Sequence, residues 1–353
     1  MWYALYEFTN KFVWPRAQLV QAGSAGFPQS ERGSESMSAT TQAVSTARRR
    51  KAGPFGEIRK NFVLYLLILP AAAYTLIYGY FTLSYLAIAF EKYNYQTGVF
   101  SPFVGLQNFK VFFDSSWAWI VTRNTIFLNL LFIITGTFCA VGLALLLNEV
   151  RQKLFLKVSQ TVMLLPFFIS WVIVSYILES LLGFDSGMIN KMITAAGGKA
   201  ISFYSTPSYW YWILILVRIW KGVGYTSIIY LAAITGIDEG LYEASYIDGA
   251  TRLQRIRYIT LPLLFPTITI LTLMDIGRIF YGDFGMFYAL IRDNGSLMPM
   301  AEVIDTYVFR MLKNTGDPSL AMAIGLYQSV VGFLLVFGSN ALARRYYPEG
   351  SLF

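Results

Sequence analysis

The stretch EASYIDGATRLQRIRYITLPLL, residues 243–264, lies between two long apolar segments. Helix-forming residues flank Asp248-Gly249, where glycine permits the positive φ of a sharp turn. Pro262 lies in the first turn of the helix predicted to follow, where a residue without an N–H is tolerated. The pattern therefore predicts helix, turn, helix, with the first helix over about residues 238–247. One face of that helix is expected to carry Leu241, Ala244, Ser245 and Asp248.

The composition around this stretch is that of a membrane protein. Of 353 residues, 56% are hydrophobic and 14% are charged, whereas soluble domains carry about 25% charged residues. The single cysteine, Cys139, lies in an apolar run, and histidine is absent. These counts exclude disulfide frameworks, thiolate metal clusters and His-dependent catalysis. We therefore predict neither a catalytic site nor a metal site on this chain.

Six apolar segments have the length of roughly 20 residues that a helix needs to cross a bilayer. They predict an all-α polytopic membrane protein. The basic residues that give the net charge of +8 flank these segments, which indicates membrane topology rather than nucleic-acid binding. The predicted spans are residues 62–89, 124–147, 160–182, 209–235, 263–290 and 320–343.

The distribution of basic residues predicts that both termini lie in the cytoplasm. Six basic residues precede the first span within residues 48–60, and the connection at 148–159 is basic too. The transmembrane domain is expected over residues 61–345, with a short cytoplasmic tail at 346–353. Residues 1–60 are expected to form a largely disordered cytoplasmic tail, rich in Ser, Gly and Ala. Met1 and Met37 both remain open as the start.

The loop after the fourth span also carries a spaced motif. Its positions are Glu243-Ala244-Ser245, Gly249, Ile259 and Leu261-Pro262. They resemble the EAA loop in permease subunits of binding-protein-dependent ABC importers, with Ser245 in place of the second alanine as the one departure. The stretch PFVGLQNFKVFF (residues 102–113) is similar to the Gly-Leu-x-Asn-Phe element of sugar-type permeases. Further stretches, among them EVIDTYVFRM and EGSLF, resemble importers of oligosaccharides and polysaccharides, most of all the permease of bacterial alginate importers.

This resemblance implies the fold of the chain and which subunits of the importer bind ATP. The fold would be that of a type I ABC importer permease, with six transmembrane helices and a cytoplasmic coupling helix in residues 238–262, in the bacterial inner membrane. Because no GxxxxGK[ST] sequence occurs, ATP and Mg would bind to partner subunits, and this chain would not be an enzyme. The implied partners are a homologous second permease, two ATP-binding subunits, an extracytoplasmic solute-binding protein and an oligosaccharide or polysaccharide substrate. The residues expected to couple to the ATPase are Glu243, Ala244, Ser245, Asp248, Gly249 and Arg252.

Charged residues inside the predicted spans are candidates for the substrate path, because ionisable groups at bilayer depth usually face a partner or a wet cavity. Two interpretations remain open. Asp275 and Arg278, three residues apart on a helix, can pair with each other. Alternatively, Arg278 and Arg218 offset carboxylates of an acidic saccharide while aromatic rings stack on its sugars. The candidates for the path are Arg218, Trp220, Asp275, Arg278, Tyr281, Asp283 and Phe284.

A secondary carbohydrate transporter, not driven by ATP, is the alternative class. Such a carrier is expected to show about twelve spans, or inverted repeats with broken helices. The sequence shows six apolar segments and no convincing repeat. Co-purification distinguishes the two classes, because a permease of an ABC importer should carry its ATPase subunits through purification.

Overall fold

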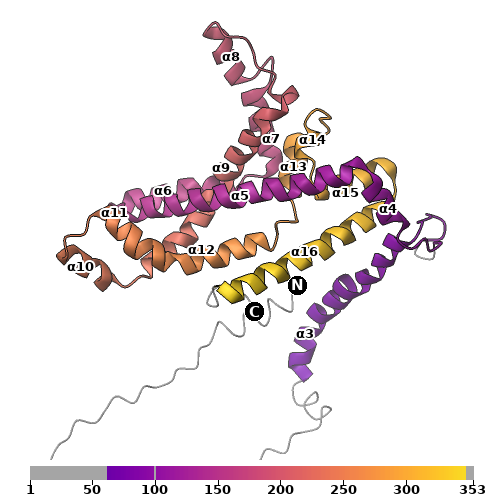
Figure 1. Ribbon diagram of the computed structural model, residues 1–353, viewed down its shortest axis with the longest axis horizontal. Coiled ribbons are helices and arrows are strands. Elements are labelled where there is room, and N and C mark those ends of the chain that lie inside the picture. Colours follow the sequence, from indigo (N-terminus) through magenta and orange to yellow (C-terminus); the bar gives the residue numbers. More distant parts are fainter. Residues whose placement is uncertain (1–61, 99–100, 347–353) are drawn as a thin grey trace, which may run out of the picture. The chain divides into compact units, whose positions relative to one another are not determined.

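The computed structural model describes residues 62–98 and 101–346. The tail predicted at 1–60, and all but Tyr346 of the tail predicted at 346–353, lie outside the described residues. The chain divides into two units, Met1–Leu66 and Leu67–Phe353. Apart from the first residues of α3, the features below belong to the second unit. In the described part, regular structure is helical, apart from two isolated β-bridges (Figure 1).

The first half of the described chain is dominated by long helices. Helix α5 runs unbroken through 33 residues and is capped by Ser115, whose side chain accepts a hydrogen bond from the Trp117 N–H at 3.2 Å. The helices are α3 (Phe62–Tyr74), continued by a π-helical segment (Thr75–Tyr80) and a 3₁₀ segment (Phe81–Phe90), α4 (Gln107–Asp114), α5 (Ser116–Asn148), α6 (Lys153–Phe168), α7 (Trp171–Leu182), α8 (Met188–Ala195) and α9 (Pro207–Thr235).

The second half alternates short and long helices. The short helices lie in the connections, and α16 ends the described chain. These helices are α10 (Glu239–Ile247), α11 (Arg252–Arg255), a π-helical turn (Ile256–Thr260), α12 (Leu261–Ile276), α13 (Phe284–Ile291), α14 (Met298–Ala301), α15 (Ile304–Arg310), a second π-helical turn (Met311–Thr315) and α16 (Pro318–Tyr346).

The number of spans agrees with the prediction of six. Five helical stretches are long and apolar enough to cross a membrane, and the bent pair α6–α7 supplies a sixth. The five are Phe62–Phe90, Ser116–Asn148, Pro207–Thr235, Arg252–Ile276 and Pro318–Ala341.

The third span is not the single helix predicted at residues 160–182. It breaks between α6 and α7, whose axes are bent by 96°. Pro166, in the last turn of α6, has no N–H to donate. Ser170 then starts α7 as its N-cap and accepts a hydrogen bond from the Ile173 N–H at 3.3 Å. A helix stop followed directly by a helix start produces the break.

The fifth span also differs from the predicted 263–290. Its helical stretch begins earlier, at Arg252, and ends at Ile276. Pro262 lies in the first turn of α12, as predicted, within this longer stretch. A π-helical turn directly before Pro262 loosens the hydrogen-bond ladder and accommodates the missing N–H. Residues 277–283 leave the helix, and a separate helix, α13, follows.

Helix α9 packs against α5 and α6. Trp210 and Leu214 of α9 are fully buried together with Leu128 of α5 and Met286 of α13. Toward the other end of α9, Gly224 meets the backbone of α6: a Cβ placed there would lie 2.0 Å from the Met163 carbonyl oxygen. The close approach of α6 and α9 therefore depends on a residue without a side chain.

We expect Gly224→Ala to destabilise the protein, because its methyl group would force the α6 backbone away. Overpacking of this kind costs about 1–3 kcal/mol. Gly222→Ala is the matched control, since a Cβ at Gly222 meets nothing within 4 Å, and alanine favours a helix interior over glycine by up to about 1 kcal/mol. Thermal unfolding in detergent should lower the midpoint only for Gly224→Ala, and equal midpoints would contradict the close contact.

Candidate functional site

The loop between α9 and α12 forms a helical elbow, here defined as residues 238–260. Asp238 caps α10 by accepting from the Gly240 N–H at 3.0 Å. Thr251 and Gln254 form a reciprocal capping box at the start of α11. Gly249, between the two helices, has φ of +73°, and a Cβ placed there would meet nothing within 4 Å. The predicted helix, turn, helix with glycine at the turn is confirmed.

Two contacts tie α10 to the beginning of the fifth span. The Tyr242 hydroxyl hydrogen-bonds to the Thr260 hydroxyl at 2.9 Å. The Arg255 guanidinium lies 3.9 Å from the centre of the Tyr246 ring. A hydrogen bond and the positive charge of Arg255 lower the pKa of the Tyr246 phenol. Both contacts join α10 to the helical stretch that starts at Arg252.

The elbow exposes most of the residues predicted to couple to an ATPase. Glu243, Ala244, Asp248 and Gly249 are exposed, as are Leu241 and Ile247 of the same helix. Arg252 is exposed as well, with its Nε 3.9 Å from the Glu149 carboxylate. Their coupling role stays a prediction.

Ser245 does not share this exposed face. Its residue surface is 8% exposed, and its hydroxyl donates to the Tyr242 carbonyl at 2.7 Å. The predicted helix holds Ser245 at the spacing of the common face, but Ser245 is buried there rather than exposed with Ala244 and Asp248. A small residue is suited to this buried position, where the hydroxyl is satisfied within its own helix.

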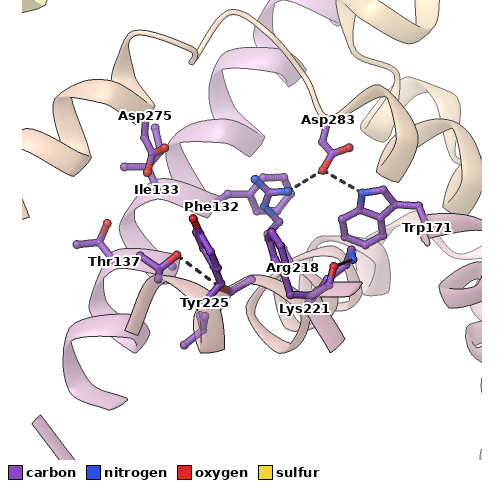
Figure 2. A pocket seen from close by; sticks show the side chains of 14 residues that line it. Phe132, Ile133, Thr137, Trp171, Arg218, Lys221, Tyr225, Asp275 and Asp283 are labelled. Carbon is purple, nitrogen blue, oxygen red and sulfur yellow. Dashed lines mark hydrogen bonds and ion pairs between the residues drawn. The ribbon is translucent and has the colours of Figure 1, made fainter. Parts of the chain in front are cut away.

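A second polar region lies where the two broken spans meet α5 and α9. A cavity of about 330 Å³ opens there, and Figure 2 shows its side chains. Arg218, Asp275 and Asp283 also line a cavity of about 400 Å³, to which Arg278 and Tyr281 contribute. We refer to these two spaces as the polar cavity.

Asp283 connects three helices at the edge of the polar cavity. Its Oδ2 accepts from Arg218 Nη1 at 2.7 Å and from the Trp171 indole N–H at 3.1 Å (Figure 2). Its Oδ1 caps α13 by accepting from the Met286 N–H at 3.1 Å. One carboxylate thus joins α9, α7 and α13.

The irregular segment 277–283 is satisfied by side chains from distant parts of the chain. The Asn129 amide of α5 donates to the carbonyls of Ile279 at 2.8 Å and Tyr281 at 3.1 Å. The Gln328 amide of α16 donates to the Phe280 carbonyl at 2.8 Å. Non-helical backbone at membrane depth is tolerated only where it is buried in protein or lines a wet cavity. This segment meets both conditions.

Five of the seven predicted path residues line the polar cavity: Arg218, Asp275, Arg278, Tyr281 and Asp283. Trp220 instead lines a separate apolar pocket beside Met163 and Gly224. Phe284 stacks on Tyr288 at 5.2 Å between ring centres.

The pairing of charges differs from the first interpretation of the sequence. Within the described residues, Asp275 and Arg278 form no ion pair, whereas Arg218 pairs with Asp283, 65 residues away. The α-helix ends at Ile276, so Asp275 and Arg278 lie on either side of that end, in a turn where the Arg278 N–H donates to the Asp275 carbonyl at 2.9 Å.

Sequence reasoning missed three residues at this site: Asn129, Trp171 and Lys221. Lys221 and Trp171 line the cavity, and Asn129 holds its irregular wall. Lys221 could have been predicted as a site residue, because it is a charged residue inside an apolar span, three positions after Arg218. Nothing in the sequence distinguishes Asn129 and Trp171 from ordinary residues of a span.

Comparison with known proteins supports the resemblance of the elbow to the EAA loop of ABC importer permeases. Residues 132–347 match the model of a family described as "Binding-protein-dependent transport system inner membrane component". Protein LplB of Bacillus subtilis (strain 168) is 36% identical over 83% of this chain and 92% of its own length. The polygalacturonan/rhamnogalacturonan transport system permease protein YteP of the same organism is 36% identical over 90% of this chain and 98% of its own length.

Solved structures agree with these relatives. A chain of a bacterial ABC transporter involved in the import of the acidic polysaccharide alginate superposes with a TM-score of 0.76, at 33% identity, over 83% of this chain and 99% of that one. A bacterial alginate ABC transporter in complex with an alginate pentasaccharide-bound periplasmic protein gives a TM-score of 0.74 at 33% identity, over 83% of this chain and 97% of that one. The all-α permease fold and the resemblance carried by the EAA loop are confirmed. The chain belongs to the family of binding-protein-dependent transport system inner membrane components, the transmembrane permeases of ABC importers.

Proposed function

We propose that this permease carries acidic oligosaccharides or polysaccharides, with alginate among the candidates, through a path that includes the polar cavity. The observation that carries the proposal is that the Arg278 side chain is available to a substrate. It is exposed and lines the cavity, and no ion pair engages it within the described chain. Arg218, by contrast, already has its Asp283 partner.

The other groups of the cavity suit a sugar acid. A guanidinium binds a carboxylate through two parallel hydrogen bonds, and Arg278 would provide it. Asp275, which lines the same cavity, has carboxylate oxygens that can accept hydrogen bonds from sugar hydroxyls. Phe132, Trp171 and Tyr281 add aromatic surface for the apolar face of a pyranose. The relatives named for polygalacturonan and alginate support an acidic substrate for this chain.

We expect Arg278→Ala to slow the uptake of an anionic oligosaccharide by roughly ten- to a hundredfold, the effect of losing a charge-assisted hydrogen bond. The measurement is uptake into proteoliposomes that contain the whole importer. Substrate-stimulated ATP hydrolysis should fall much less, because the elbow is unchanged.

The matched control is Lys191→Ala, which removes a positive charge from the exposed side of α8, away from the cavity. It should leave uptake unchanged. If Arg278→Ala lowers uptake and ATP hydrolysis equally, Arg278 is a structural residue. If it slows a neutral oligosaccharide as much as an anionic one, the substrate is not recognised by its charge.

The importer would assemble from this chain, a second homologous permease, two ATPase subunits that bind ATP and Mg, and a solute-binding protein. The exposed residues of α10 would dock on an ATPase subunit, whose closure on nucleotide would move the elbow and rock the spans. Affinity purification of the tagged permease in mild detergent tests this assembly. Purification of the chain alone, with uptake that needs no nucleotide, would favour the alternative of a secondary transporter.

The same proposal places the elbow and both termini on the cytoplasmic side of a bacterial inner membrane. A cysteine at Ile247, which is 88% exposed, can be introduced after Cys139 is replaced by serine. In membranes that contain the permease without its ATPase subunits, a membrane-impermeant thiol reagent should label it only in inside-out vesicles. Labelling in intact cells would contradict the topology.

A further inference from the structure

The Lys221 side chain of α9 reaches the break between α6 and α7. Its ammonium donates to the carbonyl oxygens of Pro166 at 3.2 Å, Phe167 at 2.7 Å and Ile169 at 2.5 Å. An ammonium has three N–H donors, so these three carbonyls use its whole donor capacity. They stand at the C-terminal end of α6, where a helix leaves its last carbonyls unsatisfied and carries negative partial charge.

Aromatic rings on both sides of the break also face this ammonium. Lys221 Nζ lies 5.8 Å from the centre of the Phe167 ring in α6 and 5.2 Å from the Trp171 ring in α7. Both distances are within the range in which a cation is attracted to a ring face. Within the described residues no carboxylate lies within ion-pair distance of Lys221, so the carbonyls and rings of the break are the direct partners of its ammonium.

The same turn of α9 holds the other broken span. Arg218, three residues before Lys221, pairs with Asp283, which caps α13 after the irregular segment 277–283. Trp171, the first residue of α7, donates to the same carboxylate oxygen. One helical turn of α9 therefore contacts both interruptions of the spans around the polar cavity.

We propose that Lys221 is a positioning residue of the transport path, which keeps the third span in its 96° bend and thereby places Trp171 against Asp283. Without the ammonium, the Phe167 and Ile169 carbonyls would lose its hydrogen bonds, and the Pro166 carbonyl would keep only the one from the Ile169 N–H. The chain would then regain hydrogen bonds by changing the angle between α6 and α7. Trp171 would then leave Asp283, and the polar cavity would lose part of its wall. The proposal holds for any transported solute, so it does not depend on the choice of an acidic saccharide.

The test combines uptake with a direct measure of the bend. Spin labels at Leu154 of α6 and Ile177 of α7, which are 70% and 40% exposed, report the distance between the two arms in a Cys139→Ser background. In the assembled importer, Lys221→Met is expected to lower uptake roughly ten- to a hundredfold, as expected for the loss of charge-assisted hydrogen bonds. The distribution of label distances should shift or broaden in the same variant.

Two further variants separate positioning from other roles. Lys221→Arg keeps the charge and several donors, so it should retain most of the uptake and the wild-type distance distribution. Lys191→Met removes an exposed lysine of α8 and should change neither measurement. A general effect of losing one positive charge would appear in Lys191→Met as well, and that result would overturn the proposal.

Unchanged uptake in Lys221→Met would overturn the proposal. So would a loss of uptake with an unchanged distance distribution, because Lys221 would then act on the solute rather than on the bend. If Lys221→Met fails to assemble, Lys221→Gln decides, since its amide still donates two hydrogen bonds without a charge. It should broaden the distance distribution and reduce uptake, and wild-type values of both would contradict the assignment.

Discussion

A Gly249→Val variant is expected to lose most of its ATP-driven uptake. Gly249 has φ of +73° at the turn between α10 and α11, a conformation that a β-branched residue strongly disfavours. Holding valine in this conformation costs about 1–3 kcal/mol, and the elbow would relax by rotating α10 away from its position beside the fifth span. Because an added Cβ meets nothing within 4 Å, the effect comes from the backbone and not from a steric clash.

Gly249→Asn is the matched control, because asparagine adopts positive φ several times more readily than most residues. It should retain most of the uptake. Both variants are measured in proteoliposomes, together with the amount of ATPase that co-purifies with the permease. Equal uptake by the valine and asparagine variants would show that the turn geometry at Gly249 does not matter for coupling.

An Arg310→Met variant is expected to destabilise the connection between α13 and α16. Arg310 is 5% exposed and Glu302 is 2% exposed, with Arg310 Nε 3.0 Å from Glu302 Oε1. Arg310 also bonds the Asp293 carboxylate and the Arg292 carbonyl. Burial raises the pKa of the Glu302 carboxyl, and the Arg310 charge opposes that rise.

Removing the arginine would leave a buried carboxylate without its cation, which costs about 3–5 kcal/mol. Thermal unfolding of the purified protein should show a clear fall in the midpoint. Adding Glu302→Gln to Arg310→Met should recover part of the loss, because the uncompensated charge is then removed as well.

Glu179→Gln provides the comparison for an exposed ion pair. Glu179 and Arg292 pair at 2.9 Å, but their side chains are 50% and 47% exposed. Exposed pairs contribute about 0–1 kcal/mol, so this variant should unfold close to the wild type. A loss as large as that of Arg310→Met would show that burial is not what distinguishes the two pairs.

Several features of this protein were predictable because they depend on local sequence. The elbow follows from Asp248-Gly249 and from the caps on both sides, since turn and cap chemistry act over a few residues. The number of spans follows from the thickness of hydrocarbon that an apolar run must cross. The family follows from the spacing of the motif that begins at Glu243, which the family match and the relatives confirm.

The arrangement within the candidate site was only partly predictable. Charged residues in the spans pointed to a polar region, and Arg218, Asp275, Arg278 and Asp283 do line one cavity. Their partners did not follow from the sequence, because Arg218 and Asp283 come from different helices. Trp220 and Trp171 are both tryptophans of apolar spans, and only the rotation of each helix decides which one faces the cavity.

The sequence by itself determined that this chain spans a membrane as a helical permease with a helical elbow between its fourth and fifth spans, because hydropathy and turn chemistry are local properties. Only the tertiary structure decided where the third and fifth spans break. A proline or glycine permits an interruption at membrane depth, but the freed carbonyls need donors, and these are supplied by Lys221, Asn129 and Gln328 from other helices. The location of those donors depends on how α5, α9 and α16 pack, which no local stretch of sequence encodes.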